Sequence, residues 1–315
     1  MDFITVKEFF EDNNEKFRLN ILAGEEYLDK KKIVVSDINR PGLALAGFFG
    51  YFPYERIQVF GKTEFTYIKK LGSVKADRVM GEIFKQNVPC VIISRNLKAP
   101  SGFLLLAKKY KTPVFESSLF TTKIISATMI YLEKKLAPKI TMHGTFVDVY
   151  GLGVLITGKS GIGKSEVTLE LVKRGHRLVA DDLIEVTRLG EGELEARGMS
   201  VVQHHMEIRG VGIIDVRTLF GVGAVRDYQK VELVLHLEEW EKGKDYERLG
   251  IEEQMQDILG VQVPKIVLPV KPGRTLSIIV EVAAMNQRLR QKGHNPAKEL
   301  NEKMMLYMFK GKKNG

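Results

Sequence analysis

Residues 158–165 read GKSGIGKS, and this stretch says more about the fold than any other part of the chain. It fits the pattern G-x-x-x-x-G-K-[ST], which is typical of loops that hold the phosphates of a nucleotide. A loop with few side chains lets consecutive backbone N–H groups turn inward around an anion. The apolar run GLGVLIT precedes the loop, and the helical pattern SEVTLELVKRG follows it. The stretch therefore predicts a strand, a phosphate loop and a helix in that order.

Each position of the motif has a chemical role. Lys164 can reach the β- and γ-phosphates as a point charge, and Ser165 can offer its hydroxyl oxygen to Mg²⁺. The helix that begins near Lys164 adds the positive end of its dipole. We expect the whole octet to contact the nucleotide: Gly158, Lys159, Ser160, Gly161, Ile162, Gly163, Lys164 and Ser165.

Size and composition are those of an ordinary globular protein. The 315 residues are 44% hydrophobic and 28% charged, which is enough for two domains. The net charge of +9 favours acidic partners such as nucleotides or nucleic acid. The single cysteine, Cys90, lies in the apolar run VPCVIIS, which predicts a buried structural thiol and a reducing compartment. Without a signal-peptide pattern or a bilayer-length apolar stretch, we expect a cytoplasmic protein.

The patterning divides the chain into two α/β domains. Residues 1–135 alternate helical and strand patterns without a nucleotide loop, and their role, assembly or regulation, stays open. Residues 136–315 carry the phosphate loop and are predicted to form the catalytic domain. There we expect strands at HRLVADD (176–182), VELVLHLE (231–238) and TLSIIVEV (275–282), the first ending in two carboxylates. Helices are expected over about 282–292 and 296–309.

Several polar residues beside these elements suit phosphoryl transfer. Asp181 and Asp182 follow the loop by one helix, where a carboxylate of a phosphate-loop enzyme can hold Mg²⁺. Its neighbour could be the general base for a hydroxyl nucleophile. The residues do not say which of the two would be the base, and solvated loop aspartates are the alternative. His143 could orient a phosphate or a base, or be structural.

Three later stretches carry charges that need an explanation. Glu207 and Arg209 interrupt the apolar run MEIRGVGIIDV, as a site or as a simple ion pair. Arg248, in YERLG, is ambiguous alone. PVKPGRT at 269–275 combines two prolines, a glycine and two cations, which suits an anion-binding loop or a basic turn.

The motif set excludes some nucleotide-binding classes and leaves others open. A GTPase would need N-K-x-D and a transport ATPase LSGGQ, and the chain contains neither. A small-molecule kinase stays possible, but it would need a closed acceptor pocket and an arginine-rich lid. The net charge also allows a nucleic-acid-dependent ATPase, although the chain has no long Arg-rich run and no aromatic-interleaved RNA-binding motif.

The ordered motifs HGTFVDVYGLGVLITGKSGIGKSE, LVADD, MEIRGVGIIDV, YERLG, PVKPGR and EVAAMNQRL resemble the bifunctional HPr kinase/phosphorylase family of bacteria. The resemblance implies a small N-terminal α/β domain and a phosphate-loop catalytic domain similar to phosphoenolpyruvate carboxykinase, assembled as a homohexamer. It implies that the enzyme uses ATP and Mg²⁺ to phosphorylate a regulatory serine of the phosphocarrier HPr. It also implies that inorganic phosphate removes this group and releases pyrophosphate. The output would be carbon catabolite repression and control of sugar uptake.

The resemblance also assigns roles to residues of this chain. Its catalytic positions are His143, Lys164, Asp182 and Arg248, with Asp182 accepting a proton in phosphorylation and donating it in the reverse reaction. Its magnesium ligands are Ser165 and Glu207. Because Asp181 is adjacent to Asp182, we keep Asp181 as a supporting candidate for the metal site. Residues 206–215 would serve both reactions. Dephosphorylation would depend on a second loop: Pro269, Val270, Lys271, Pro272, Gly273 and Arg274. The expected partner is HPr, with neither nucleic acid nor a membrane.

Overall fold

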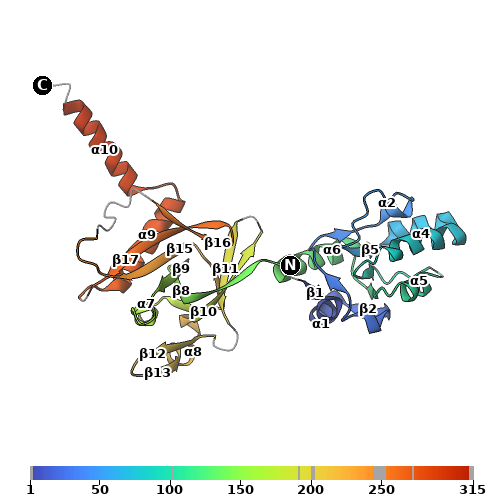
Figure 1. The fold of residues 1–315 in the computed structure, drawn as a ribbon, viewed down its shortest axis with the longest axis horizontal. Coiled ribbons are helices and arrows are strands. Elements are labelled where there is room, and N and C mark those ends of the chain that lie inside the picture. Colours follow the sequence, from blue (N-terminus) through green and yellow to red (C-terminus); the bar gives the residue numbers. More distant parts are fainter. Residues whose placement is uncertain are drawn as a thin grey trace. The chain divides into compact units, whose positions relative to one another are not determined.

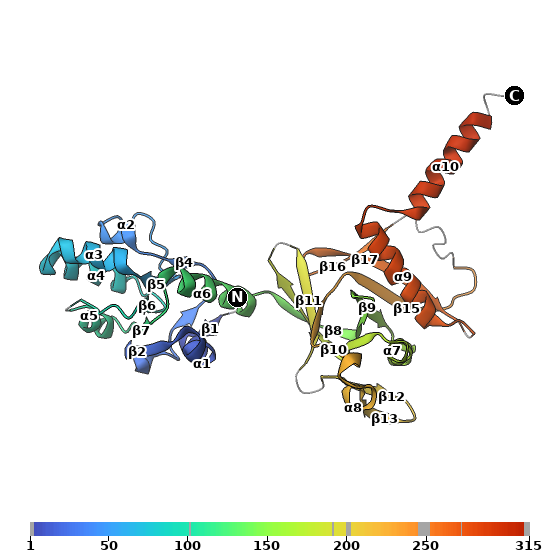
Figure 2. The same cartoon turned by 180° about the vertical axis from the view of Figure 1, so that it is seen from behind.

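The computed structural model describes residues 3–100, 102–190, 192–199, 203–244, 253–271 and 273–311. The chain divides into two compact units, Met1–Ala137 and Pro138–Gly315. Figures 1 and 2 show both units from opposite sides. No helix within the described ranges is long and apolar enough to cross a membrane.

The N-terminal unit is a five-stranded sheet with helices on both faces. The strands β4 to β7 are parallel neighbours, and β2 pairs antiparallel with β7 at the edge. In sheet order they are β2 (Leu19–Ala23), β7 (Val114–Ser117), β6 (Val91–Ile93), β5 (Ile57–Phe60) and β4 (Ile38–Asn39). A separate short pair joins β1 (Ile4–Thr5) to β3 (Lys32–Ile33).

Successive side chains along these short strands point to opposite faces of the sheet, so each face has its own hydrophobic core. The core on one face includes Phe60, and it is covered by α2 (Gly42–Leu45), α3 (Lys62–Leu71), α4 (Ser73–Lys85) and α5 (Phe103–Lys109). The core on the other face includes Phe115, and it is covered by α1 (Val6–Phe17) and α6 (Thr121–Lys135). Cys90 is fully buried in this second core, and burial raises the pKa of its thiol. The predictions of a small α/β domain and of a buried structural thiol are both confirmed.

The C-terminal unit contains an eight-stranded mixed sheet. The strands β9, β15 and β17 are parallel, and the other neighbours are antiparallel. The sheet order is β14 (Tyr228–Lys230), β11 (Glu193–Gly198), β10 (Arg177–Leu189), β8 (Lys139–Val149), β9 (Leu152–Gly158), β15 (Leu233–Glu239), β17 (Val261–Val270) and β16 (Gln254–Ile258).

One face of this sheet is covered by α7 (Lys164–Lys173) and α9 (Leu276–Gln291), which enclose a core that includes Ile156 and Leu235. On the other face, Ile184 of β10 and Ile258 of β16 belong to one core, so strands from both halves of the sheet meet there. A hairpin of β12 (His205–Ile208) and β13 (Gly212–Asp215) leads into α8 (Val216–Phe220) and packs near α7. The chain continues through α10 (Pro296–Gly311).

The structure corrects one predicted element. The strand expected over 275–282 is wrong, because TLSIIVEV belongs to α9, which begins at Leu276 rather than near 282. Leu276, Val280 and Ala284 are buried four residues apart, which is one face of a helix. The run of β-branched residues resembles a strand locally, but burial against α7 and the sheet decides the outcome.

A buried ion network fastens α7 to α9. The carboxylate of Glu281 accepts two hydrogen bonds from Arg174, at 2.9 and 2.7 Å, and lies 2.9 Å from Nε2 of His176. Glu281 and His176 are both almost fully buried. The bonds from Arg174, followed by those from His176, lower the pKa of Glu281 to about 2. The network therefore holds the C-terminal end of α7 against its neighbour.

We expect Glu281→Gln to lower the free energy of unfolding at pH 7 by about 2 kcal/mol, because the neutral amide loses the ion pair with Arg174. Loss of a fully buried ion pair would cost more, but water screens the partly exposed Arg174. A depressed carboxyl pKa stabilises the fold above the ordinary value near 4.5, and this contribution is lost as the pH falls toward about 2. Urea unfolding across this range should show the two proteins converging in acid. The exposed Glu302 on α10, changed to Gln, is the control. Equal stability of Glu281→Gln and wild type at pH 7 would contradict the assignment.

Candidate active site

The phosphate loop lies between β9 and α7, in the predicted order of strand, loop and helix. Three of its glycines, Gly158, Gly161 and Gly163, have positive φ angles of 145°, 81° and 105°. A Cβ atom on Gly158 would lie 2.5 Å from the backbone oxygen of Leu237 in β15. Side chains are therefore excluded where the loop leaves the sheet, and the backbone can turn sharply around an anion.

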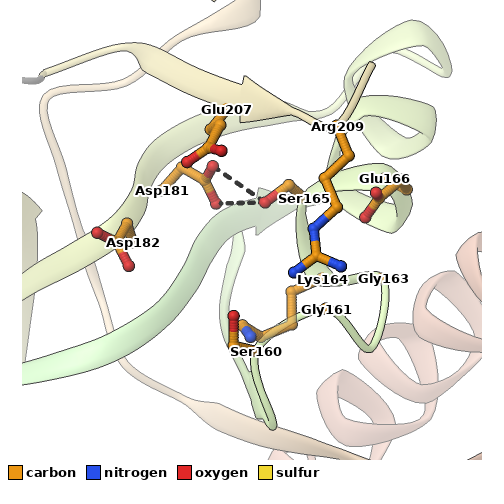
Figure 3. A pocket seen from close by; sticks show the side chains of 10 residues that line it. All are labelled: Ser160, Gly161, Gly163, Lys164, Ser165, Glu166, Asp181, Asp182, Glu207 and Arg209. Atoms are coloured by element: carbon orange, nitrogen blue, oxygen red, sulfur yellow. Dashed lines mark hydrogen bonds between the residues drawn. The ribbon is translucent and has the colours of Figure 1, made fainter. Parts of the chain in front are cut away.

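A polar pocket opens above this loop (Figure 3). The loop and the first turn of α7 form one side, while β10 and the β12–β13 hairpin form the other. Lys164 donates to the backbone oxygens of Gly158 and Lys159, at 3.1 and 3.0 Å, so its ammonium group lies within the loop. The lining residues are Ser160, Gly161, Gly163, Lys164, Ser165, Glu166, Asp181, Asp182, Glu207 and Arg209.

Asp181 is a buried carboxylate directly behind Ser165. Its side chain accepts a hydrogen bond from the Thr145 hydroxyl at 2.8 Å, and the Ser165 hydroxyl lies 3.1 Å from both of its oxygens. Burial raises the pKa of Asp181, and these hydrogen bonds partly oppose that rise. Asp181 is thus hydrogen-bonded to Ser165, the last residue of the loop motif.

Asp182 lies in a different environment, although it is the next residue. Its side chain is 80% exposed, and one oxygen lies 3.6 Å from Nδ1 of His143, which is also 80% exposed. Figure 3 shows its carboxylate apart from the Ser165–Asp181 pair. The φ angle of Asp182 is 71°, a left-handed conformation that is uncommon for a residue other than glycine. This backbone turn separates the two neighbouring carboxylates.

The location of these aspartates corrects a second prediction. The strand does not end at the two carboxylates, because β10 continues to Leu189 and pairs with β8 on both sides of them. Asp181 is opposite Thr145, and Asp182 is opposite Gly144. The two aspartates are therefore held within a long ladder rather than in a loop, which fixes their position more firmly than the sequence indicates.

The β12–β13 hairpin brings two further charges to the pocket. Glu207 lies on β12, and Arg209 lies in the turn that follows. The guanidinium group of Arg209 approaches the loop so closely that a Cβ on Gly161 would lie 2.7 Å from it. The sequence left open whether Glu207 and Arg209 form an ion pair or a site, and the structure brings both to the phosphate loop.

Other candidate residues lie elsewhere or outside the described residues. Lys159 and Ile162 belong to the loop without lining the pocket, and His143 lies beside Asp182 without lining it. Arg248 and Pro272 fall outside the described residues.

Among the described residues of 269–274, Lys271 lies 5.2 Å from the centre of the Trp240 ring, and Arg274 is exposed. None of them lines the pocket described here. Pro269 and Val270 are the last two residues of β17, and the other described residues follow its C-terminal end. The strand β17 is parallel to β9, with β15 between them. The segment therefore leaves the same edge of the sheet as the phosphate loop.

Sequence reasoning missed two residues of the site. Glu166 lines the pocket, and its signal was its position directly after the loop motif. Thr145 binds Asp181 from β8, and it carried no local signal because its partner lies 36 residues away.

The fold and the pocket define a phosphate-loop α/β protein with carboxylates facing the loop. Comparisons with known proteins make this class specific. The family described as HPr Serine kinase N terminus matches residues 4–132, and the HPr Serine kinase C-terminal domain matches residues 134–304. The chain therefore belongs to the HPr kinase/phosphorylase family, and the resemblance seen in its motifs is confirmed.

Full-length relatives agree with this assignment. The chain is 47% identical over 306 residues to the HPr kinase/phosphorylase of Caldanaerobacter subterraneus, covering 97% of this chain and 98% of that protein. It is 44% identical over 305 residues to that of Alkaliphilus metalliredigens, covering 97% of each. A solved structure, the Hpr(Ser) kinase/phosphatase from Coxiella burnetii, is 38% identical, covers 52% of this chain and 99% of that chain, and has a TM-score of 0.47. The predicted enzyme class, a kinase and phosphorylase, is confirmed with the family.

Proposed function

We propose that this enzyme transfers the γ-phosphoryl group of ATP to a serine hydroxyl of HPr, and that inorganic phosphate removes the group again as pyrophosphate. Family membership supports the reaction and the protein substrate. One structural observation carries the mechanism. A single pocket combines a phosphate loop, the buried carboxylate of Asp181 beside Ser165, and the exposed carboxylate of Asp182.

The oxygen donors of the pocket fit Mg²⁺. Ser165, Asp181 and Glu207 all line it, and Mg²⁺ prefers such hard oxygen ligands. The described residues contain no cluster of three or more His, Cys, Asp or Glu side chains that could hold a metal alone. Mg²⁺ needs no such cluster, since it is usually held by one or two carboxylates together with substrate phosphates. When bound, the ion would neutralise charge on the transferring phosphoryl group.

The difference in exposure between the two aspartates supports Asp182 as the group that exchanges the serine proton. A serine hydroxyl is a weak nucleophile until a base accepts its proton. Asp181 is 8% exposed and already hydrogen-bonded, whereas the Asp182 side chain is 80% exposed and can meet a serine on another protein. In the reverse reaction the same carboxyl group would return the proton to the leaving serine oxygen. His143, 3.6 Å away, can orient that carboxylate.

The cations of the site suit both directions. Lys164 and Arg209 line the pocket, so a nucleotide phosphate or orthophosphate in the loop would meet the same positive groups. If orthophosphate occupies the position of the nucleotide's β-phosphate, its oxygen can attack the phosphoserine, and the new P–O–P bond yields pyrophosphate. The basic segment 269–274 leaves the same sheet edge and can assist this second anion.

The exposure of Asp182 and of the neighbouring His143 favours a protein acceptor over a metabolite. A small-molecule kinase would bury its acceptor, but His143 and Asp182 are both 80% exposed. The proposal includes a cytoplasmic enzyme that acts on neither nucleic acid nor membranes and controls sugar uptake through catabolite repression. It also includes a homohexamer and an assembly or regulatory role for residues 1–135, which the family resemblance supports.

A two-stage assay tests the proposal. Purified enzyme and HPr receive ATP and Mg²⁺, then the nucleotide is removed and inorganic phosphate is added. We expect phosphoserine to form in the first stage and to disappear in the second, with one pyrophosphate per phosphoserine lost. Parallel reactions contain DNA, RNA or a panel of metabolites in place of HPr. Transfer to a metabolite, or ATP hydrolysis stimulated by nucleic acid without transfer to HPr, would contradict the proposal.

Asp182→Asn is expected to slow both directions by about 10²- to 10⁴-fold, because the amide cannot accept or return the serine proton. Nucleotide binding, measured with a fluorescent ATP analogue, should stay within about two-fold of wild type, since the exposed carboxylate makes no hydrogen bond to the described residues of the loop. Asp181→Asn is the informative comparison, and its nucleotide binding in Mg²⁺ should weaken. If both variants lose nucleotide binding equally, Asp182 belongs to the metal site rather than to proton transfer.

Arg274→Ala is expected to slow the phosphate-driven reaction about ten-fold and the ATP-driven reaction by less than about three-fold. The reason is that the exposed arginine follows β17 and can attract an added anion. Initial rates of both stages, measured over a range of phosphate concentrations, give the comparison. Arg78→Ala, an exposed arginine on α4, is the control. Equal damage to both directions would remove the special role of this segment.

A further inference from the structure

A buried hydroxyl group lies behind the pocket, on the strand next to the phosphate-loop strand. Thr145 of β8 is directly opposite Asp181 of β10 and also opposite Ile156 of β9. It has no exposed surface. Its hydroxyl donates to Oδ1 of Asp181 at 2.8 Å. The side chain thus contacts the site from within the sheet.

The Asp181 carboxylate accepts hydrogen bonds from two side-chain hydroxyl groups. Thr145 donates to Oδ1, and the Ser165 hydroxyl lies 3.1 Å from Oδ1 and Oδ2 as a donor. Because its proton points toward Asp181, the lone pairs of the Ser165 oxygen are left for the pocket. A cation there would meet a serine oxygen already oriented to receive it. Outer carboxylates commonly orient metal ligands in this way.

A hydroxyl group at position 145 is unusual for packing alone, because the surrounding strand is apolar and buried. Its neighbours Phe146 and Val147 are fully buried apolar residues, and valine would fill the same space as threonine without burying a polar group. Burying a hydroxyl is unfavourable unless it is hydrogen-bonded, and here the bond is made to a charged acceptor. Thr168 on α7 is a contrast, because its buried hydroxyl has no hydrogen-bond partner among the described residues.

We propose that Thr145 is a positioning residue of the magnesium–nucleotide site. Its hydroxyl holds the Asp181 carboxylate in the orientation that turns the Ser165 oxygen toward the cation. This inference rests on the proposed function in one respect, that Ser165 binds a divalent cation together with a nucleotide. It does not depend on the identity of the phosphoryl acceptor.

The test is Thr145→Val, with nucleotide affinity measured by a fluorescent ATP analogue in Mg²⁺ and again in EDTA. We expect affinity in Mg²⁺ to fall about ten-fold, as for loss of a hydrogen bond to a charged group, and affinity in EDTA to change by less than about two-fold. A higher Mg²⁺ concentration should restore binding. Thr145→Ser, which keeps the hydroxyl, should bind as the wild type does.

Thr168→Val is the matched control, since it makes the same chemical change at a buried threonine without a hydrogen-bond partner in the described structure. It should leave both affinities unchanged. Thermal melting checks that each variant is folded. If Thr145→Val melts below the wild type, both affinities are compared at a temperature well below its melting point. In a Ser165→Ala background, removal of the Thr145 hydroxyl should have no further effect on affinity in Mg²⁺.

Two results would overturn the inference. The first is wild-type affinity of Thr145→Val in Mg²⁺, and the second is an equal loss in Mg²⁺ and EDTA, which would indicate a disturbed loop. Failure of the HPr reaction is a separate outcome. If the enzyme binds Mg²⁺–nucleotide through Thr145 but does not phosphorylate HPr, the acceptor is wrong and the positioning role stands.

Discussion

The geometry of the site depends on the register of three neighbouring strands. Thr145 of β8 is opposite Ile156 on one side, two residues before the phosphate loop, and opposite Asp181 on the other. A slip of one residue would turn the aspartate to the opposite face of the sheet. Gly144 permits the close approach of β9, since a Cβ there would lie 2.6 Å from the Ile156 oxygen. The strand that leads into the loop and the strand that carries Asp181 and Asp182 are therefore held on either side of β8.

This register also determines how the surroundings of the two adjacent carboxylates differ. Alternation along β10 directs Asp181 toward Ser165, and the left-handed backbone at Asp182 directs the next side chain to solvent. The same residue type thus acquires two environments, one buried and hydrogen-bonded, the other 80% exposed. Such a contrast suits a pair in which one carboxylate supports a cation and the other exchanges protons with a large acceptor.

Local chemistry made part of this site predictable from sequence. The glycine-rich loop is contiguous, and its motif alone gives the strand, loop and helix. The different environments of Asp181 and Asp182 could not be predicted, because they arise from pairing with β8 and from one φ angle. Thr145 could not be identified from sequence either, because it meets Asp181 only through the pairing of β8 with β10. TLSIIVEV was assigned to the wrong element because its helical face becomes evident only through burial of Val280 and Ala284.

Charge balance in the pocket connects the two proposed directions. Its described lining has four carboxylates and two cations, although the whole chain has a net charge of +9. A phosphate entering alone would add negative charge to a site that already has an excess of it, so a divalent cation should accompany either anion. ATP and orthophosphate would then compete for one loop and one cation. The ratio of the two ligands, rather than a rearranged site, would set the direction of transfer, because the same carboxyl group can exchange the serine proton either way.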